Sequence, residues 1–528
     1  MSQAYDNFIK LATKEFFQNS KDFLRFKKQT AGKLGFQPPT NADLRDYYEK
    51  MLAKKKIRRN PALEKMLFSK KIRTASGVAV VAVLTKPYPC PGKCIYCPSE
   101  KAMPKSYLSN EPAVMRAVSA KFNPFTQVQR RLRALELNGH PIDKIELIIM
   151  GGTFSYLPKK YQKRFITECF RACNDYTSHK VHKVIKSIKS LKAEQKKNET
   201  SRVRIVGLTL ETRPDYIEEK EILNFRNLGC TRVELGVQSI FDSVLEKNKR
   251  GHTIRETIRA TRLLKDAGFK INYHMMPGLL GSTPKRDVEM FRKLFESQDF
   301  QPDMLKIYPT IVNDKSELWK IWKAGKYQPL TNNQFEKIIL EIKNNILPPY
   351  VRLQRLIRDV PESEISAGPN ISNLRQIIKS KTHCQCIRCR EIGQDYDSKE
   401  KLVLDRIDYE ASGGQEIFLQ LVSRDKSKLF ALLRLRIPGD KNHFIPALKN
   451  SAVIREVHTY GNLAKISQKS ALSPQHQGLG KKLVQEAERI ARKEFQMKKI
   501  AVISGVGVRG YYRKLGYRLR DTYMVKSL

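Results

Sequence analysis

Acidic residues are scarce in this chain. Its 528 residues include 53 Asp and Glu against 99 Lys and Arg, which gives a formal net charge of +46. Such an excess of positive charge attracts polyanions and supplies contacts to phosphates. Binding to a membrane surface is the competing explanation, but no lipidation signal and no amphipathic membrane segment accompanies the charge. The composition therefore favours a nucleic acid as partner.

Long apolar runs are missing as well. No stretch approaches the roughly 20 residues that span a bilayer, and the first residues do not resemble a signal peptide. We therefore expect a cytoplasmic protein without a membrane partner. Cysteine is also scarce, and most of the nine cysteines cluster, which in a reducing compartment indicates metal binding rather than disulfides. The three outside the clusters are expected to be buried core thiols: Cys169, Cys173 and Cys230.

At this length the chain is expected to form about three domains. Residues 1–75 look helical and basic. From Val78 onwards, short apolar stretches alternate with helical ones, and such repeated βα units predict a parallel sheet, either open or curved into a partial barrel. The expected strands are 78–84, 145–150, 204–210, 232–236, 270–274 and 304–307. The expected helices lie around 127–138, 160–172, 216–227, 253–267 and 284–297.

The pattern changes at three further places. A Lys-rich stretch, 176–202, interrupts the rhythm and is expected to be a mobile or nucleic-acid-facing insertion. Residues 371–400 are expected to form a Cys-rich metal-binding linker. Residues 401–528 predict a separate αβ module, with antiparallel strands within 402–437 and 450–459, a turn at Gly413-Gly414, a helix at about 478–495 and a strand at 499–503. Basic runs recur at 53–59, 183–197 and 481–482, which favours a distributed phosphate-binding surface.

The most informative motif is a Pro-rich loop that carries Cys90, Cys94 and Cys97 at C-x3-C-x2-C spacing. Iron–sulfur clusters are normally held by four Cys thiolates, so three thiols leave one iron open to a ligand that is not protein. An aromatic residue before the last Cys, here Tyr96, is the form seen where S-adenosylmethionine chelates that iron. The alternatives are a zinc knuckle without its fourth ligand and a chance cluster. The spacing favours a [4Fe–4S] cluster with S-adenosylmethionine.

A glycine pair, Gly151-Gly152, follows the apolar stretch 145–150, one βα unit after the thiol loop. Glycines at the carboxyl end of a strand let a ligand approach the backbone closely. In radical-SAM enzymes the corresponding pair holds the methionyl amino group of S-adenosylmethionine, although Thr153 stands where many of them carry Glu. Without the thiol loop before it, the pair would be read as a plain turn.

Near the carboxyl end, Gln475, Gly478 and Gly480 form a Q-x-x-G-x-G loop before a predicted helix. The first N–H groups of a helix bind anions, and in this motif they face the pyrophosphate of coenzyme A. The hexamer alone occurs by chance, but a strand with residues 456–459 precedes it and a Tyr-rich segment, 511–517, follows it. This order is typical of GNAT acetyltransferases, so we expect an acetyl-CoA site.

A second thiol group, Cys384, Cys386 and Cys389, has the C-x-C-x2-C form of a zinc or iron site. Structural zinc takes four tetrahedral nitrogen or sulfur ligands. The neighbouring His383 is a candidate for the fourth ligand. A structural role between the two halves of the chain is expected here rather than a catalytic one.

A radical-SAM core fused directly to a GNAT domain resembles the Elongator catalytic subunit family, the tRNA uridine-34 carboxymethylating enzymes, in its single-chain bacterial or archaeal form. The similarity covers most of residues 75–528, although the Cys90–Cys94 spacing is shorter than in eukaryotic members and the N-terminal region matches only loosely. The matching motifs include Cys94-Ile-Tyr-Cys97-Pro, Met150-Gly-Gly-Thr153, Glu211-Thr-Arg-Pro-Asp215, His274-Met-Met-Pro-Gly278, Lys306-Ile-Tyr-Pro309 and Tyr511-Tyr-Arg-Lys-Leu-Gly-Tyr517.

The resemblance implies a radical-SAM domain at 76–370 and a GNAT domain at 401–528. It also implies a reaction: the 5′-deoxyadenosyl radical takes a hydrogen from the methyl group of acetyl-CoA, the carbon radical adds to C5 of the wobble uridine, and thioester hydrolysis leaves 5-carboxymethyluridine. The tRNA anticodon stem-loop, held partly by residues 1–75, and an electron donor are the implied partners. Monomer and homodimer both remain open.

The resemblance also assigns site residues. Lys144 and Tyr512 are implied to contact acetyl-CoA and are the catalytic candidates, and Lys306 is implied to contact S-adenosylmethionine. The remaining coenzyme A contacts are the backbone of Glu456, Val457, His458 and Thr459 for the pantetheine, and Leu479, Gly480 and Lys481 for the phosphates.

Two other functions remain open from the residues alone. A protein lysine acetyltransferase with a structural iron–sulfur half would use the same C-terminal loop, but a net charge of +46 disfavours basic peptide substrates. A non-catalytic tRNA-binding protein would retain both folds, yet all three thiols of the first loop are present.

Overall fold

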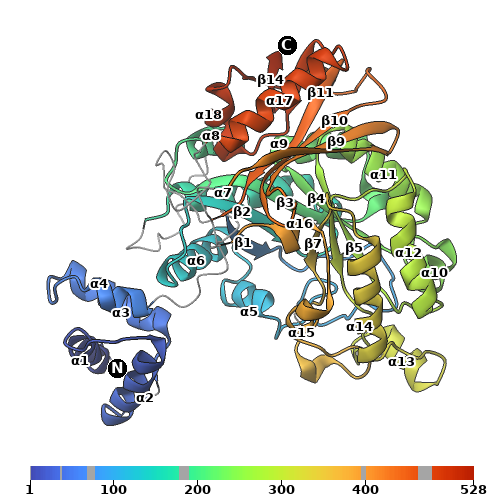
Figure 1. Ribbon diagram of the computed structural model, residues 1–528. Helices are drawn as coiled ribbons and strands as arrows, with labels where there is room; N and C mark the ends of the chain where they lie inside the picture. Colours follow the sequence, from blue (N-terminus) through green and yellow to red (C-terminus); the bar gives the residue numbers. More distant parts are fainter. Residues whose placement is uncertain are drawn as a thin grey trace.

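The computed structural model describes residues 2–35, 38–67, 78–177, 190–358, 360–393, 400–461 and 478–528. Two seven-stranded sheets form most of it, and a small helical bundle stands beside them (Figure 1). Within the described residues, no helix is both long enough and apolar enough to cross a membrane.

All seven strands of the first sheet are parallel and lie in chain order. They are β1 (Ala79–Leu84), β2 (Lys144–Met150), β3 (Arg204–Thr212), β4 (Arg232–Gln238), β5 (Lys270–Met275), β6 (Met304–Ile307) and β7 (Arg352–Arg355). The helices that accompany them are α5 (Pro112–Ser119), α6 (Pro124–Leu137), α7 (Lys159–Asn174), α8 (Leu191–Asn198), α9 (Glu219–Leu228), α10 (Asp242–Lys247), α11 (Ile254–Asp266), α12 (Pro284–Glu296), α13 (Glu317–Lys323) and α14 (Asn332–Glu341). The predicted α/β partial barrel is confirmed, and β7 is a strand that the sequence pattern did not indicate.

Local sequence explains where these helices begin and end. The Asn123 side chain accepts from the Thr126 N–H at the start of α6, and Pro124 occupies the first turn, where no N–H is needed. Thr253 and Glu256 form a reciprocal capping box at α11. Gly229 ends α9 with φ +91°, a left-handed conformation that glycine adopts without strain.

The second sheet has the strand order β13-β14-β12-β11-β10-β9-β8 and is antiparallel except for the pair β11–β12. Its strands are β8 (Val403–Ala411), β9 (Gly414–Val422), β10 (Leu429–Ile437), β11 (Ser451–Thr459), β12 (Lys499–Val502), β13 (Arg518–Arg520) and β14 (Tyr523–Ser527). Helix α17 (Leu479–Lys493) buries an apolar stripe on it, including Leu483, Ala487 and Ile490, and α18 (Arg509–Arg513) follows β12. The short helices α15 (Leu374–Ile377) and α16 (Ile387–Arg390) connect the two sheets.

The N-terminal helices α1 (Ser2–Ala12), α2 (Ser20–Lys33), α3 (Asn41–Ala53) and α4 (Pro61–Leu67) form the predicted helical region. They enclose a small core of their own, with Phe8 and Leu44 fully buried. Contact with the barrel runs through Arg133 of α6, which pairs with Asp46 at 2.5 Å and with Glu49 at 3.2 Å.

The second sheet docks on the amino-terminal ends of the barrel strands. The Tyr523 hydroxyl donates to the Ala267 carbonyl oxygen at 2.8 Å, and Val453 packs so closely on Gly268 that an added Cβ would lie 2.8 Å from its Cγ1. One continuous apolar core joins the two halves, with Leu264 of the barrel and Phe418 of the second sheet in the same cluster. Packing therefore fixes how the halves sit relative to each other.

A buried network of charges crosses the same interface. The fully buried Arg455 of β11 donates to Asp303 beside β6 at 2.9 Å and to Glu416 of β9 at 2.7 Å. Lys270 at the start of β5 pairs with Glu456 at 3.0 Å, and Arg434 of β10 pairs with the same carboxylate at 3.0 Å. Buried charges are tolerated only when they are paired in this way.

The Lys-rich stretch requires a correction. Residues 178–189 lie outside the described residues, but 190–202 are a packed part of the barrel and not an exposed insertion. Asn198 of α8 is fully buried, where its amide donates to the Val203 carbonyl and accepts from the Ile205 N–H. The lysines of α8 face outwards. Glu199, the residue directly after α8, is buried and pairs with Arg513 of α18 at 2.7 Å. The number of lysines predicted an exposed insertion, but the lysines lie on only one face of α8 and the opposite face is buried.

Candidate functional site

The thiol loop leaves β1 at the carboxyl end of the barrel, away from the second sheet. Cys94 is buried, and Cys90 and Cys97 are half-buried. The Gly92 N–H donates to the Cys90 sulfur at 3.4 Å. A side chain at Gly92 would meet the guanidinium of Arg213, whose Nη1 would lie 2.5 Å from the added Cβ. A larger residue at this position would therefore have to displace the end of the Arg213 side chain.

Two arginines make the surroundings of the loop cationic. Arg250 Nη1 lies 3.6 Å from the Cys94 sulfur, and Arg213 approaches Gly92 while pairing with Asp215 at 2.9 Å. A hydrogen bond from the Cys97 thiol, followed by the charge of Arg250, lowers the pKa of Cys94 to about 4. The same contact with Cys94, together with burial, raises the pKa of Cys97 well above its ordinary value. Thiolates are the form of cysteine that ligates metals, so the surroundings favour the thiolate at Cys94.

Unpartnered polar atoms also gather around this loop. Among the described residues, buried polar atoms without a hydrogen-bond partner include Tyr96 Oη, Arg213 Nη1, Arg250 Nε and Thr85 Oγ1. Such groups are rare in a finished protein interior and call for a ligand or water. The Cys94 and Cys97 thiols are in contact with each other, whereas Cys90 does not form a close triad with them in the described part of the chain. Two thiols in contact, the third thiol of the same loop, two guanidinium groups and these free donors fit a [4Fe–4S] cluster with a polar co-ligand.

The glycine pair lies directly beside the loop. Gly151 and Gly152 have φ of +132° and +91°, and a Cβ at Gly151 would lie 2.0 Å from Thr85 Oγ1, at the point where the thiol loop begins. Side chains are excluded at Gly151, so a ligand can reach the backbone at the carboxyl end of β2. The predicted glycines and the segment that leads into the thiol loop thus lie side by side at this end of the barrel.

Polar side chains line one face of the barrel strands, and the sequence analysis gave a role only to Lys306 among them, although Glu211 and His274 each begin a matching motif. The Lys306 ammonium pairs with the Glu234 carboxylate, to which His274 Nε2 also hydrogen-bonds at 2.8 Å. Glu211 lies 3.5 Å from His274 Nδ1 and accepts from the Tyr107 hydroxyl at 2.8 Å. The missed signal is a polar residue at every second position within apolar strands, as with Glu211 beyond Thr209 in β3.

The charges of this network hold one another in place. Burial alone would raise the pKa of Glu234, but Lys306 and then His274 lower it well below its ordinary value. Burial likewise opposes the charge of Lys306, and Glu234 raises its pKa. The barrel interior therefore carries a fixed ion pair, suited to orienting a polar ligand such as the sulfonium and carboxylate groups of S-adenosylmethionine.

Lys144 lies at the opposite end of the barrel. It is the first residue of β2, half-buried, and burial lowers its pKa. Its register partner on β3 is Arg204. Gly507 lies close to Arg204, because a Cβ added at Gly507 would be 2.7 Å from the Arg204 Cβ. Lys144 therefore faces the segment before α18, between the two halves.

Strand β11 pairs with β12 along only the first part of its length. It pairs in parallel with β12 only from Ser451 to Ile454, while residues 456–459 keep their antiparallel partners on β10. The ladder with β12 therefore ends before 456–459, and an extended ligand such as pantetheine can add to a strand along a side where the neighbouring strand has ended. The Glu456 side chain points elsewhere, into the interface network.

The start of α17 lies beside residues 457–459 of β11. Gly478 has φ +86°, which begins the helix, and the first N–H groups, from Leu479 onwards, have no partner within it. A Cβ on Gly480 would lie 3.3 Å from the Tyr511 hydroxyl and 3.9 Å from Thr459 Oγ1. Of the predicted coenzyme A residues, Gly480 thus lies beside Val457 and Thr459, while Gln475 lies outside the described residues.

Tyr512 occupies a different environment from its neighbour. It is buried in the core between α17 and the second sheet, and burial raises its pKa. Tyr511 is 40% exposed and stands over the α17 loop, a position that the sequence analysis did not single out.

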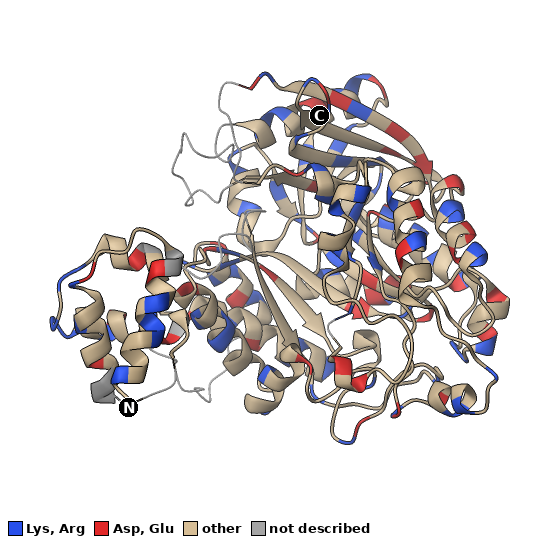
Figure 2. Cartoon of the chain, turned by 60° about the horizontal axis from the view of Figure 1, so that its bottom comes forward, with Lys and Arg blue, Asp and Glu red and all other residues tan. Residues whose placement is uncertain are grey.

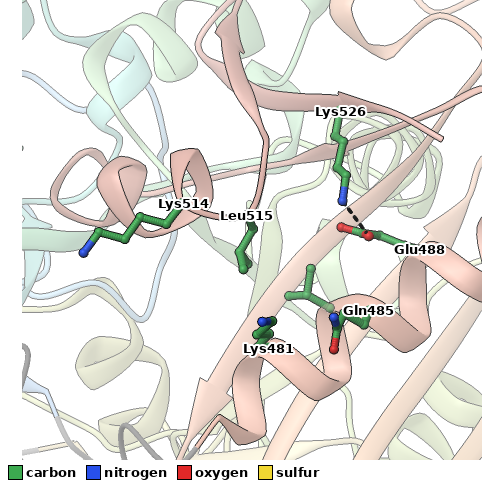
Figure 3. A pocket seen from close by; sticks show the side chains of 7 residues that line it. Lys481, Gln485, Glu488, Lys514, Leu515 and Lys526 are labelled. Carbon is green, nitrogen blue, oxygen red and sulfur yellow. Dashed lines mark hydrogen bonds and ion pairs between the residues drawn. The ribbon is translucent and has the colours of Figure 1, made fainter.

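A pocket lies beside α17 (Figure 3). Lys481 and Lys526 line it, and Lys526 pairs with Glu488 at 2.8 Å, whereas the ammonium group of Lys514 points away from the other lining side chains. Lys481, in the first turn of the helix, is thus the lysine of this pocket best placed to contact an anionic group. The full lining is Lys481, Val484, Gln485, Glu488, Lys514, Leu515 and Lys526.

The second thiol group is also assembled. The sulfurs of Cys384, Cys386 and Cys389 all lie within 4.8 Å of one another at the start of α16, a spacing that suits one metal ion. Lys343 Nζ approaches the Cys389 sulfur at 3.3 Å. His383 is exposed and does not join this group in the described part of the chain, so three thiols are the ligands that the structure assembles. The three cysteines outside both groups are buried in the barrel core, as expected: Cys169, Cys173 and Cys230.

The chain is similar to known proteins over most of its length. The Radical SAM superfamily model matches residues 88–294 and the Radical_SAM C-terminal domain matches 302–383. The tRNA uridine(34) acetyltransferase of Methanocaldococcus infernus is 44% identical over 518 residues, which cover 94% of this chain and 93% of that protein. Elongator complex protein 3 of Homo sapiens is 38% identical over 532 residues, covering 96% and 93%.

A solved structure has a similar fold over most of this chain. The archaeal Methanocaldococcus infernus Elp3 with N-terminus deletion (1-46) is 42% identical, with a TM-score of 0.74 over 86% of this chain and 100% of that one. The radical-SAM match implies a [4Fe–4S] cluster and S-adenosylmethionine, for which the thiol loop is the fitting site. By sequence identity, coverage and fold, the chain belongs to the radical-SAM family that contains the tRNA uridine(34) acetyltransferases and Elongator complex protein 3.

Proposed function

We propose that this chain is a transferase that modifies uridine 34 of tRNA, using S-adenosylmethionine and acetyl-CoA to attach a carboxymethyl group at C5. The observation that carries the proposal is the placement of two sites at opposite ends of one barrel. The thiol loop stands at the carboxyl end of the strands, and residues 456–459 of β11, beyond the ladder with β12, stand at the amino end. A shared core holds the two ends in register.

At the carboxyl end, Cys90, Cys94 and Cys97 would hold the cluster, and Gly151 with Gly152 would admit the methionyl group of S-adenosylmethionine. When bound, these groups supply the 5′-deoxyadenosyl radical that takes hydrogen from the acetyl methyl group. The arginines beside the loop offset the negative charge of the thiolates. Lys306, oriented by Glu234, would contact S-adenosylmethionine from the barrel wall.

At the amino end, the backbone of 456–459 would pair with pantetheine, and the N–H groups of Leu479, Gly480 and Lys481 would bind the phosphates. Lys144 faces the same space from the barrel and would contact acetyl-CoA, as would Tyr512 or its exposed neighbour Tyr511. A site enclosed between two packed halves excludes water, which protects reactive intermediates.

Positive charge supports tRNA as the substrate. The net charge is +46, and the turn after α3 exposes Lys54, Lys55, Lys56 and Arg58. Lysines and arginines bind the phosphate backbone, while unpaired anticodon bases can be turned out and read. The thiols of Cys384, Cys386 and Cys389 would hold a structural zinc ion where the two halves join.

The test is anaerobic reconstitution with reductant, S-adenosylmethionine, acetyl-CoA and tRNA, followed by mass spectrometry of the nucleosides. We expect 5-carboxymethyluridine from the native protein and none from Cys94→Ala. Cys173→Ala is the matched control, because Cys173 is a buried core thiol far from the loop, and it should retain the product. Product from Cys94→Ala, or none from the native protein, would defeat the proposal, and acetylated lysine peptides from Cys94→Ala would favour a protein acetyltransferase.

A further inference from the structure

Helix α13 is attached directly to the thiol loop. The Leu318 N–H donates to the Ile95 carbonyl oxygen at 2.8 Å, and the Ser99 N–H donates to the Lys315 carbonyl oxygen at 2.9 Å. Leu318 is fully buried in the same apolar cluster as Cys94. These contacts on both sides of the loop place α13 one packing layer outside the thiols.

The outer side of α13 is basic and aromatic. Lys320, Lys323 and Lys326 are exposed. Trp319 and Trp322, the two tryptophans of the chain, are half-buried beside them, and Lys323 Nζ lies 5.4 and 5.2 Å from their ring centroids. We call this surface the α13 face.

Acidic side chains do little to cancel this charge. Glu317 pairs with Lys249 at 2.5 Å, so it is balanced by a lysine from another element. Asp314 is exposed but precedes the helix, and Glu364 is already paired with Lys315 at 2.8 Å. The α13 face therefore presents a net positive potential to an approaching molecule.

The α13 face lies at the end of the barrel that the second sheet leaves uncovered. Helix α13 follows β6 at its carboxyl end, whereas the second sheet docks on the amino ends of the strands. Figure 1 shows the second sheet at the top and α13 at the lower right, and Figure 2 turns the lower surface with its basic residues towards the viewer. A substrate that must meet residues 456–459 of β11 approaches from the other end of the barrel, so the α13 face is available to a different partner.

We propose that the α13 face is the docking site of an acidic protein that delivers single electrons to the cluster. The inference rests on the proposed function, since it takes the cluster in the thiol loop as the acceptor. In each encounter the reduced carrier is oxidised by one electron and the cluster is reduced by one electron, and no bond or proton has to move.

The chemistry of the surface fits such a partner better than RNA. Encounters that transfer electrons use small interfaces steered by opposite charge, and tryptophan is enriched where protein interfaces bind most strongly. RNA-binding aromatics need open ring faces for base stacking. Here Trp319 and Trp322 are half-buried and already covered by Lys323.

The first test uses the native full chain. Because Trp319 and Trp322 are its two tryptophans, its tryptophan emission reports on α13 alone. We expect saturable quenching by an acidic [2Fe–2S] ferredoxin that lacks tryptophan, and weaker quenching at higher salt. Emission that does not respond to the ferredoxin overturns the proposal, and this readout does not depend on catalytic activity.

The second test compares two triple variants of equal charge change. The variant Lys320→Glu, Lys323→Glu, Lys326→Glu should be reduced by ferredoxin at least about tenfold more slowly, with cluster reduction followed by electron paramagnetic resonance. Reduction by dithionite should be unchanged. The control reverses three exposed residues at the far end of α17, Arg492, Lys493 and Lys498, and should behave as the native protein.

The outcomes separate the possibilities. Equal rates in both triple variants, or equal slowing, would refute the α13 face as the docking site. Loss of tRNA affinity with an unchanged ferredoxin rate would make it an RNA contact instead. If the glutamate variant does not fold, replacing the same three lysines by glutamine should give an intermediate rate. Failure to form 5-carboxymethyluridine would refute the proposed function yet leave the quenching and the reduction rate measurable.

Discussion

Replacing Arg455 by methionine tests how much the buried charge network contributes to holding the two halves together. Arg455 donates to Asp303 and Glu416 and to the Phe269 carbonyl oxygen at 2.7 Å, and its side chain is fully buried. Methionine keeps much of the apolar volume but leaves two carboxylates with one cation fewer. Removing one partner of a buried ion pair costs about 3–5 kcal/mol. That is a large share of the roughly 5–15 kcal/mol by which proteins are stable.

The assay is urea unfolding followed by circular dichroism, on Arg455→Met, Asp303→Asn and the double variant. Because the two side chains share one interaction, the double variant should cost about 1–3 kcal/mol less than the sum of the singles. The control is Lys426→Met, which removes an exposed pair with Asp405 of 2.6 Å and should cost under about 1 kcal/mol. An Arg455→Met cost as small as the control, or full additivity, would refute the reasoning.

The same network predicts a pH dependence. Burial alone would raise the pKa of Asp303, but Arg455, and then Lys265 and Arg434, hold it far below its ordinary value. A depressed pKa in the folded state stabilises the protein above the unfolded value of about 4 and stops doing so as the pH falls towards the folded value. We therefore expect stability to fall below about pH 4 in the native protein, and to fall less steeply there in Arg455→Met.

Three further predictions concern single positions. Gly505→Ala should destabilise the chain by about 1–3 kcal/mol in the same assay, because its Cβ would lie 2.0 Å from the Val206 carbonyl oxygen, and unchanged stability would contradict the packing described. Gly480→Ala should weaken acetyl-CoA binding about tenfold in calorimetry while leaving stability equal or higher, since the new methyl group crowds Tyr511 and the phosphate loop; equal binding would exclude that loop. Cys386→Ser should lose zinc in elemental analysis, and full retention would remove Cys386 from the ligands.

Much of the fold could be predicted because its elements have strong local patterns. Strands such as β2, where Leu147 stands in a short run of apolar residues, are easy to recognise, and their helices are capped by local residues. Strand β7 escaped prediction because Arg352 and Arg355 bound a four-residue stretch whose strand character comes only from pairing with β6. Helix α8 escaped because its buried face is polar, and only the contacts of Asn198 show it to be packed. The domain boundaries at 75, 370 and 400 remain predictions.

The sequence likewise predicted some residues of the candidate site and missed others. The thiols and glycines could be located because ligand loops need fixed residue types at fixed spacing. The partners of Glu456 could not, because Lys270 is 186 residues away in sequence and meets it only through the docking of the two halves. His274 and Glu234 form their pair across neighbouring strands, 40 residues apart. Long-range pairing of this kind leaves no local signal.

The core that runs unbroken from the barrel into the second sheet also limits how the proposed reaction can proceed. With Leu264 and Phe418 packed in one cluster, neither half can swing towards the other without opening the interior. The ligands themselves must then carry the reacting groups between the two ends of the barrel. The pantetheine of coenzyme A is a long, flexible arm, and a nucleotide turned out of an RNA loop is another. The protein would act as a rigid frame through which two mobile arms reach the same point.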